Sequence, residues 1–176
     1  VDSMIIGNGL CLRVWRDADL PILTELRNDL AVQAQLLSRA RGSTEVQVRE
    51  WLVRRHSEQS SLLFVIASND NDEPLGFTQV LDIDYVDRKG NFGICLISDA
   101  RGRGLGVQVI DIMTNYLRDS WNFNKLSLRV RADNHAALRC YEKAGFERCG
   151  LLREDVFIDG RLQNVVLMER FFQHPG

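Results

Sequence analysis

Three glycines stand at alternate positions in the stretch "RGRGLGVQVIDIMTNYL", just ahead of a strongly periodic apolar pattern. They are Gly102, Gly104 and Gly106, and Arg101 and Arg103 flank the first of them. Glycines at the start of a helix leave backbone N–H groups accessible, and the positive end of the helix dipole attracts an anion such as a phosphate. Taken alone, the stretch fits a phosphate site and a plain glycine-rich turn with solvated arginines equally well.

Two well-known phosphate motifs do not match this stretch. A P-loop ends in Gly-Lys-Ser/Thr, whereas this loop continues as Gly-Leu-Gly-Val from Gly104. The dinucleotide fingerprint GxGxxG requires a glycine at the position of Val107. Binding of some other nucleotide phosphate stays open at this point.

A second group of residues with chemical potential follows in "DNHAALRCYEKAGF". Asn134 is a natural N-cap and Gly145 a natural C-terminal stop, so the pattern predicts a short helix between them. Tyr141 shares an apolar face of that helix with Ala137 and Leu138. An aromatic residue in such a place is either part of the core or a functional phenol.

The surrounding pattern predicts the elements that position these residues. Strands are expected at residues 10–14, 62–68, 75–84, 91–97 and 125–133, with a turn at 88–90 and a C-terminal hairpin that turns at Asp159-Gly160. Helices are expected after Asp17 or Asp19, after the capping box of Thr44 and Gln47, from the glycine loop onward, and after Asn134. This order of elements predicts a mixed sheet with helices on both faces.

The first of these helices has a clear apolar face. Leu20, Leu23, Leu26 and Leu30 recur at helical spacing, and Pro21 suits the first turn. We expect all four leucines to face the core.

Composition excludes several classes of protein. A net charge of −2 and a pI near 5.9 argue against a nucleic-acid binder. No apolar run approaches the ~18 residues of a membrane span. The four cysteines and three histidines show no metal-ligand spacing, which predicts reduced thiols, a cytoplasmic location and no metal.

In this order and at this spacing, the two motifs resemble the acyl-CoA-binding core of the GNAT N-acetyltransferase superfamily. The matching residues are Arg101, Gly104 and Gly106 in the loop, and Asn134, Tyr141, Gly145 and Phe146 in the second motif. The likeness covers nearly the whole chain and is strongest to the branch of ribosomal-protein, spermidine and amino-sugar N-acetyltransferases. In the C-terminal hairpin, Asp159 and Asn164 replace the usual Asn and Asp of that branch.

The resemblance implies an α+β fold in one domain over residues 1–176, with a mostly antiparallel mixed sheet of about seven strands flanked by helices on both faces. It implies transfer of acetyl from acetyl-CoA, the co-substrate, to a primary amine by direct attack in a ternary complex. The amine could belong to a polyamine, an amino sugar or a protein N-terminus. A CoA-binding regulatory or scaffold module that has lost catalysis is the alternative, and a homodimer is conceivable.

The resemblance also implies roles for individual residues. Coenzyme A would be bound by the strand residues Cys95, Leu96 and Ile97, by the loop residues Arg101, Gly102, Arg103, Gly104, Leu105 and Gly106, and by Asn134. A bulge, which Gly93 would tolerate, would splay the strand from its neighbour. Backbone N–H groups at 95–97 would polarise the thioester carbonyl. Tyr141 would be the general acid, because a phenol with a pKa near ~10 can protonate the departing thiolate.

The general base and the acceptor site stay open. Asn91 stands where many relatives carry a glutamate, and asparagine cannot be a base. The proton of the amine could pass through water to Asp82, Asp84 or Glu154, or the acceptor amine could already have a lowered pKa. At the end of the first helix, the polar residues Glu25, Arg27, Asn28 and Asp29 could shape the acceptor cleft, although an exposed role is favoured for each of them.

Overall fold

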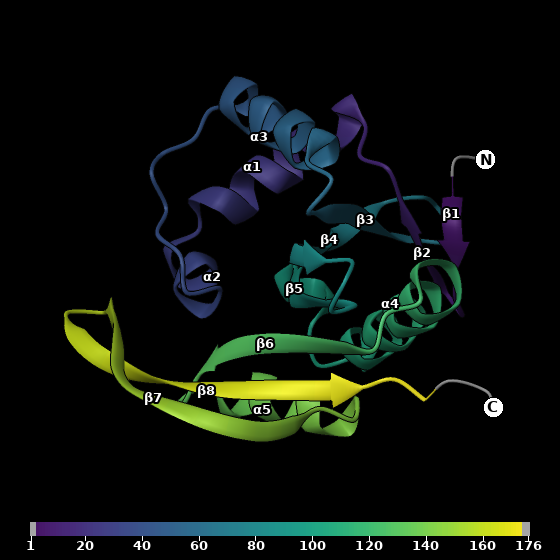
Figure 1. Cartoon of the computed structure of the whole chain (residues 1–176). Coiled ribbons are helices and arrows are strands. Elements are labelled where there is room, and N and C mark those ends of the chain that lie inside the picture. The colour runs from purple at the N-terminus through teal and green to yellow at the C-terminus, as the bar shows by residue number, and fades with distance from the viewer. Residues whose placement is uncertain (1–2, 174–176) are drawn as a thin grey trace.

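In the computed structural model, which describes residues 3–173, the chain folds into a mixed sheet with helices on both faces (Figure 1). The eight strands lie in the order β1-β2-β3-β4-β5-β6-β8-β7. The strands are β1 (Ser3–Ile6), β2 (Leu10–Arg13), β3 (Leu62–Ser68), β4 (Pro74–Asp84), β5 (Lys89–Leu96), β6 (Lys125–Arg131), β7 (Glu147–Ile158) and β8 (Arg161–Phe171). The helices are α1 (Leu20–Asn28), α2 (Leu30–Gln35), α3 (Glu45–Ser57), α4 (Leu105–Trp121) and α5 (His135–Lys143).

Each face of the sheet has its own hydrophobic core. In β3, Leu63 and Val65 pack with α1 and α3, whereas Phe64 and Ile66 pack with α4 on the opposite face. A strand that is covered on both faces is apolar at every position, because alternate side chains point to opposite cores. This explains the continuous apolar run of β3.

The sheet divides where β5 meets β6. Antiparallel pairing joins β5 to β4 along almost its whole length. Parallel pairing joins β5 to β6 only where Lys89, Gly90 and Asn91 face residues 125–127. Beyond Asn91 the two strands diverge, and one edge of β5 has no strand partner.

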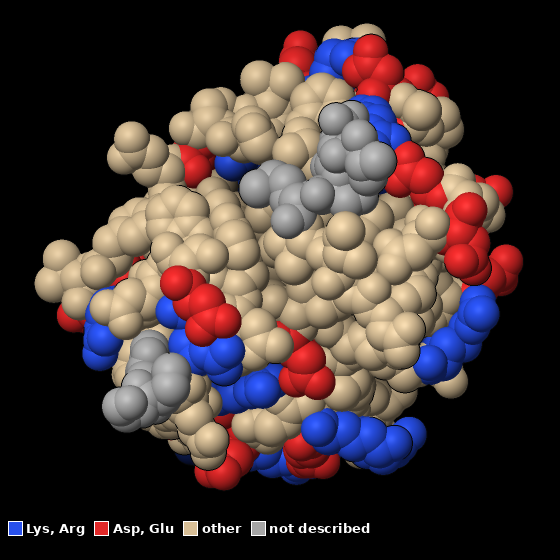
Figure 2. Space-filling model, turned by 90° about the vertical axis from the view of Figure 1, so that its right-hand side faces the viewer, with Lys and Arg blue, Asp and Glu red and all other residues tan. Residues whose placement is uncertain are grey.

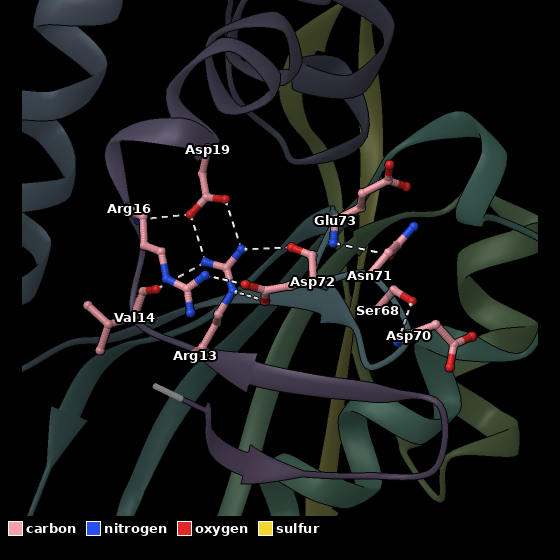
Figure 3. A network of polar contacts seen from close by, with 9 residues as sticks. All are labelled: Arg13, Val14, Arg16, Asp19, Ser68, Asp70, Asn71, Asp72 and Glu73. Carbon is pink, nitrogen blue, oxygen red and sulfur yellow. Dashed lines mark hydrogen bonds and ion pairs between the residues drawn. The ribbon is translucent and has the colours of Figure 1, made fainter. Parts of the chain in front are cut away.

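A buried ion pair fixes the beginning of α1 to the sheet (Figure 3). Arg13 and Asp19 are each 1% exposed, and they form two hydrogen bonds, Nη1 to Oδ2 at 2.8 Å and Nη2 to Oδ1 at 2.9 Å. Arg13 Nε also donates to Asp72 Oδ1 at 2.8 Å, in the turn between β3 and β4. These contacts join β2, α1 and that turn, because one guanidinium reaches all three.

Charged side chains mix their signs over the surface that contains β1 and α4. Figure 2 shows this side, with basic and acidic residues interspersed along the rim and a broad uncharged area between them. Over the described residues of this face there is no stripe of one sign, which agrees with the weak net charge.

Most predicted elements are present. The capping box of Thr44 and Gln47 starts α3, and Asp159 and Gly160 have the positive φ angles, 54° and 75°, of a type I′ turn. Of the turn predicted at 88–90, only Arg88 lies in a turn, with a φ of 56°. Lys89 and Gly90 already belong to strand β5. An eighth strand, β1, was not predicted, because four residues are too few to show a period.

Two expectations for the first helix were wrong. Asp19 stands at the N-cap position of α1 but caps no helix amide, because its carboxylate binds Arg13 and the backbone N–H of Arg16. The helix ends at Asn28, since Asp29 caps the new helix α2 by accepting a hydrogen bond from the Val32 N–H at 2.9 Å. Leu30 therefore leaves the apolar face and is 76% exposed.

The buried ion pair makes a stability prediction. Arg13→Met leaves the Asp19 carboxylate buried without its partner, and we expect the free energy of unfolding in urea to fall by about 3–5 kcal/mol. Arg49→Met is the matched control, because it breaks the exposed ion pair with Asp17, and the expected loss is below about 1 kcal/mol. Equal losses in the two variants would contradict a structural role for the buried pair.

Candidate active site

A cavity of about 710 Å³ lies where β5 and β6 diverge. Its walls come from β4, β5, β6, α2 and α5 and from the first turn of α4. The divergence of the two strands places the unpaired edge of β5 on this cavity.

The glycine loop borders the cavity at the N-terminus of α4. Gly104 is the N-cap residue with φ 76°, no side chain caps the helix there, and Gly102 has φ 70°. The first N–H groups of an α-helix have no partner within the helix. Gly102, Gly104, Leu105 and Gly106 all line the cavity, so the first turn of α4 presents free amides to a ligand.

The two arginines of the loop lie in different places. Arg101 lines the cavity, and its Nε donates to the Leu96 carbonyl at 2.9 Å, which joins the loop to the end of β5. Arg103 donates to the Asp99 carbonyl at 3.4 Å and does not line the cavity. Of these two arginines, only Arg101 is placed to contact a ligand in the cavity.

Gly106 allows α4 and α5 to approach each other closely. A Cβ atom at this position would lie 2.9 Å from Sγ of Cys140 in α5, too close for an ordinary contact. The absence of a side chain at Gly106 thus serves helix packing as well as access to the backbone.

The hydrogen-bonding register of β5 decides which amides face the cavity. The Ile97 N–H donates to the Leu75 carbonyl at 2.9 Å, so this N–H points toward β4. Because N–H directions alternate along a strand, the Cys95 N–H also points toward β4. The N–H groups of Ile94 and Leu96 therefore point toward the cavity. Of the three residues expected to bind the cofactor on this strand, Cys95 and Leu96 line the cavity and Ile97 does not.

The predicted bulge is elsewhere. Gly93 pairs regularly with Gln79, whereas the register shift between β4 and β5 falls between Leu81 and Asp84. Asp82 lies in this shift with φ 51°. The splay of β5 needs no irregularity at Gly93, because β6 simply diverges from it.

The Cys95 thiol is buried and unreactive. It is 5% exposed, and burial raises its pKa to about 12. Because the thiolate is the nucleophilic form, Cys95 is unsuited to forming an acyl-enzyme.

Tyr141 lines the cavity from helix α5. Its helix α5 begins at Asn134, whose Oδ1 accepts from the Ala137 N–H at 3.2 Å, and ends before Gly145, with φ 83°. The Tyr141 ring packs edge-on against Phe146, with centroids 5.8 Å apart, and also lines the cavity. Burial raises the pKa of Tyr141, so the phenol keeps its proton well above its ordinary range. The ring thus packs in the core and also borders the cavity.

One of the three candidate carboxylates lies in the cavity. Asp82 lines it and accepts a hydrogen bond from Nδ2 of Asn91 at 2.9 Å. Asp84 instead accepts the backbone N–H groups of Val86 and Asp87 in the following turn. Glu154 lies on the β7–β8 hairpin and does not line the cavity.

The polar residues at the end of α1 do not reach the cavity. Arg27 stacks on the Trp51 ring, 4.2 Å from its centroid, Asn28 forms two hydrogen bonds with the backbone of Ser43, and Asp29 caps α2. Neither these three nor Glu25 lines the cavity.

One wall of the cavity comes from a segment that the sequence pattern did not predict to line it. Its residues are Val32, Gln35, Leu36 and Leu37, from α2 and its C-terminus. Asp29 as an N-cap is the one sequence signal that could have revealed this short helix.

Residues 3–173 contain no group of three or more His, Cys, Asp or Glu side chains that could hold a metal ion. Within the same residues no helix has the length and apolar character needed to cross a membrane.

Known proteins share both the sequence pattern and the fold. A family model described as an acetyltransferase (GNAT) domain matches residues 9–147. The spermidine N(1)-acetyltransferase of Vibrio cholerae is 26% identical over 163 residues, 93% of each chain. The Escherichia coli K12 spermidine N(1)-acetyltransferase is 31% identical over 117 residues, 66% of this chain and 61% of that one. A solved structure of the Vibrio cholerae enzyme with CoA and spermine has a TM-score of 0.87 at 24% identity, covering 94% of this chain and 96% of that one.

Proposed function

The chain belongs to the GNAT acetyltransferase family and is an acetyl-CoA-dependent N-acetyltransferase, and we propose that its acceptor is an aliphatic primary amine acetylated directly within a ternary complex. One observation carries the proposal: a single cavity joins the free amides of α4, the unpaired edge of β5, Tyr141 and the carboxylate of Asp82. The related spermidine acetyltransferases make polyamines natural first acceptors to test.

Coenzyme A would lie along β5 with its pyrophosphate at the start of α4. The free N–H groups of Leu105 and Gly106 suit phosphate oxygens, and the guanidinium of Arg101 adds positive charge. The outward N–H groups of Ile94 and Leu96 suit the carbonyl oxygens of the pantetheine arm and of the thioester. Asn134 lies on the same wall, as the cap of the helix that carries Tyr141.

Acetyl transfer requires two proton movements. The amine nitrogen attacks the thioester carbonyl carbon, the C–S bond breaks, and the amine loses a proton that Asp82 accepts directly or through water. The departing thiolate takes a proton from the Tyr141 hydroxyl, which gives an amide and the free thiol of coenzyme A. Loss of the proton from Asp82 to solvent and uptake of one by the Tyr141 phenolate then restore the enzyme. Asn91 is a positioning residue, because its amide holds the Asp82 carboxylate at 2.9 Å.

The regulatory alternative lacks support from the site. It was motivated by the missing glutamate at Asn91, and Asp82 supplies a carboxylate at the same place. Release of free thiol from acetyl-CoA in the presence of an amine distinguishes the enzyme from a binding module.

Self-association through the C-terminal hairpin belongs to the same proposal. Leu151, Phe157 and Leu162 are each more than half exposed on β7 and β8, whose tip extends past the rest of the sheet (Figure 1). One solved structure of the Vibrio cholerae enzyme is dodecameric. Light scattering should give at least the mass of a dimer, and a monomer at micromolar concentration would contradict the proposal.

The role of Tyr141 predicts a selective loss of turnover. Tyr141→Phe should lower kcat about 100-fold or more with little change in the KM for acetyl-CoA, because only the proton donor is lost. Tyr116→Phe is the control, since Tyr116 packs against Phe64 and does not line the cavity.

The raised pKa of Tyr141 adds a pH readout to this comparison. Since the phenol acts in its protonated form, the wild-type rate should rise as the amine deprotonates and show no descending limb up to about pH 10. Unchanged turnover in Tyr141→Phe would contradict the assignment, and an alkaline limb below that pH that this variant abolishes would contradict the raised pKa.

The phosphate role of the loop predicts a selective loss of affinity. Gly104→Val should raise the KM for acetyl-CoA about tenfold or more, because a branched side chain disturbs the loop at the first free amides. Gly9→Val is a matched control: Gly9 has φ 80° against 76° for Gly104, and a Cβ meets no atom within 4 Å at either position. The backbone strain is therefore similar, and equal effects on the KM would refute a ligand at the loop.

A further inference from the structure

The wall of the cavity contains a buried oxygen atom that accepts no hydrogen bond. Oε1 of Gln79 on β4 is inaccessible to solvent and accepts no hydrogen bond. Gly93 faces it on β5, and a Cβ there would lie 3.4 Å from Cγ of Gln79, so the side chain extends across the glycine. Both residues line the cavity. A buried acceptor without a hydrogen bond is unfavourable, and Oε1 gains a ligand donor once the Gln79 side chain turns toward the cavity.

A strained leucine also lines the cavity. Leu37 has φ 56° just after α2, where the Ser38 N–H donates to the Gln33 carbonyl at 2.8 Å and ends the helix. Glycine or asparagine usually occupies this left-handed position, because a larger side chain is unfavourable there. Leu37 lines the cavity together with Leu36 and Leu81. The chain thus maintains an aliphatic wall at the expense of backbone strain.

A single carboxylate among the described lining residues can pair with a cationic ligand, and it is Asp82. Of the lining cations, Arg129 already pairs with Asp155. An amine with one ammonium group can pair with Asp82. A second ammonium on the same molecule would have to lie against the aliphatic wall without a carboxylate partner, which is unfavourable.

We propose that this enzyme acetylates an amine that has a single positive charge and an uncharged, largely aliphatic body, in preference to a polyamine. The nitrogen donates to Asp82 and, once the Gln79 side chain has turned toward the cavity, to its Oε1, and the body packs on Leu36, Leu37 and Leu81. This inference rests on the proposed function and names its substrate class. The proposed amine differs from spermidine, the substrate of the related enzymes. The difference follows from the residues that line the cavity of this chain.

Two acceptors of equal length test the charge preference. Hexylamine and 1,5-diaminopentane differ only in a terminal methyl or ammonium group, and spermidine extends the comparison. We expect kcat/KM to be at least about tenfold higher for hexylamine, which corresponds to about 1.4 kcal/mol. A preference for the diamine or spermidine would overturn the inference and leave the acetyltransferase function intact. Failure of all three amines to release thiol from bound acetyl-CoA would count against the proposed function itself.

Substitution of Gln79 tests its role separately. Gln79→Met should raise the KM for hexylamine about tenfold and leave the KM for acetyl-CoA unchanged, with a thermal midpoint no lower than that of the wild type, because an unpaired acceptor has been removed. Gln79→Glu should shift the preference toward the diamine. Gln163→Met is the control, since Gln163 also has a buried amide atom without a partner but does not line the cavity. An unchanged amine KM in Gln79→Met would overturn the role of this residue.

Discussion

Strand β5 pairs with β6 over only three of its residues, and the chemistry of the site depends on that divergence. A fully paired β5 would direct the N–H groups of Ile94 and Leu96 to a neighbouring strand, and no cavity would exist there. The chain that follows β5 forms the glycine loop, and the chain that follows β6 forms α5, so the two diverging strands bring the free amides of α4 and Tyr141 to one cavity.

The divergence is stable because packing supports both halves of the sheet. Helix α4 covers the β1–β5 half, and Gly106 lets α5 approach α4 closely. On the other face, α1 and α3 form a second core, and the Arg13–Asp19 ion pair holds the beginning of α1 against β2. The open edge of β5 is thus surrounded by elements that have little freedom to close it.

Features that depend on neighbouring residues could be predicted from the sequence. The capping box at Thr44, the cap at Asn134 and the turn at Asp159-Gly160 are all of this kind, and the order of two motifs sufficed for the family. Features that depend on distant pairing could not be predicted. The register of β4 against β5 selects Leu96 rather than Ile97 as a cavity residue, and the contact between Arg13 and Asp72 joins residues 59 positions apart. The cavity wall formed by α2 was not predicted either, because a single residue, Asp29, divides one apparent helix into two.

Residue-resolved amide hydrogen exchange of β5, measured with and without saturating coenzyme A, tests the central claim most directly. The Ile94 and Leu96 N–H groups face the cavity and should exchange more slowly once the pantetheine arm hydrogen-bonds to them. Those of Gly93 and Cys95 already bond to β4 and should change little. Slowing at Gly93 and Cys95 alone, or no change at Ile94 and Leu96 with the ligand bound, would contradict an open β5 edge that holds the acetyl donor.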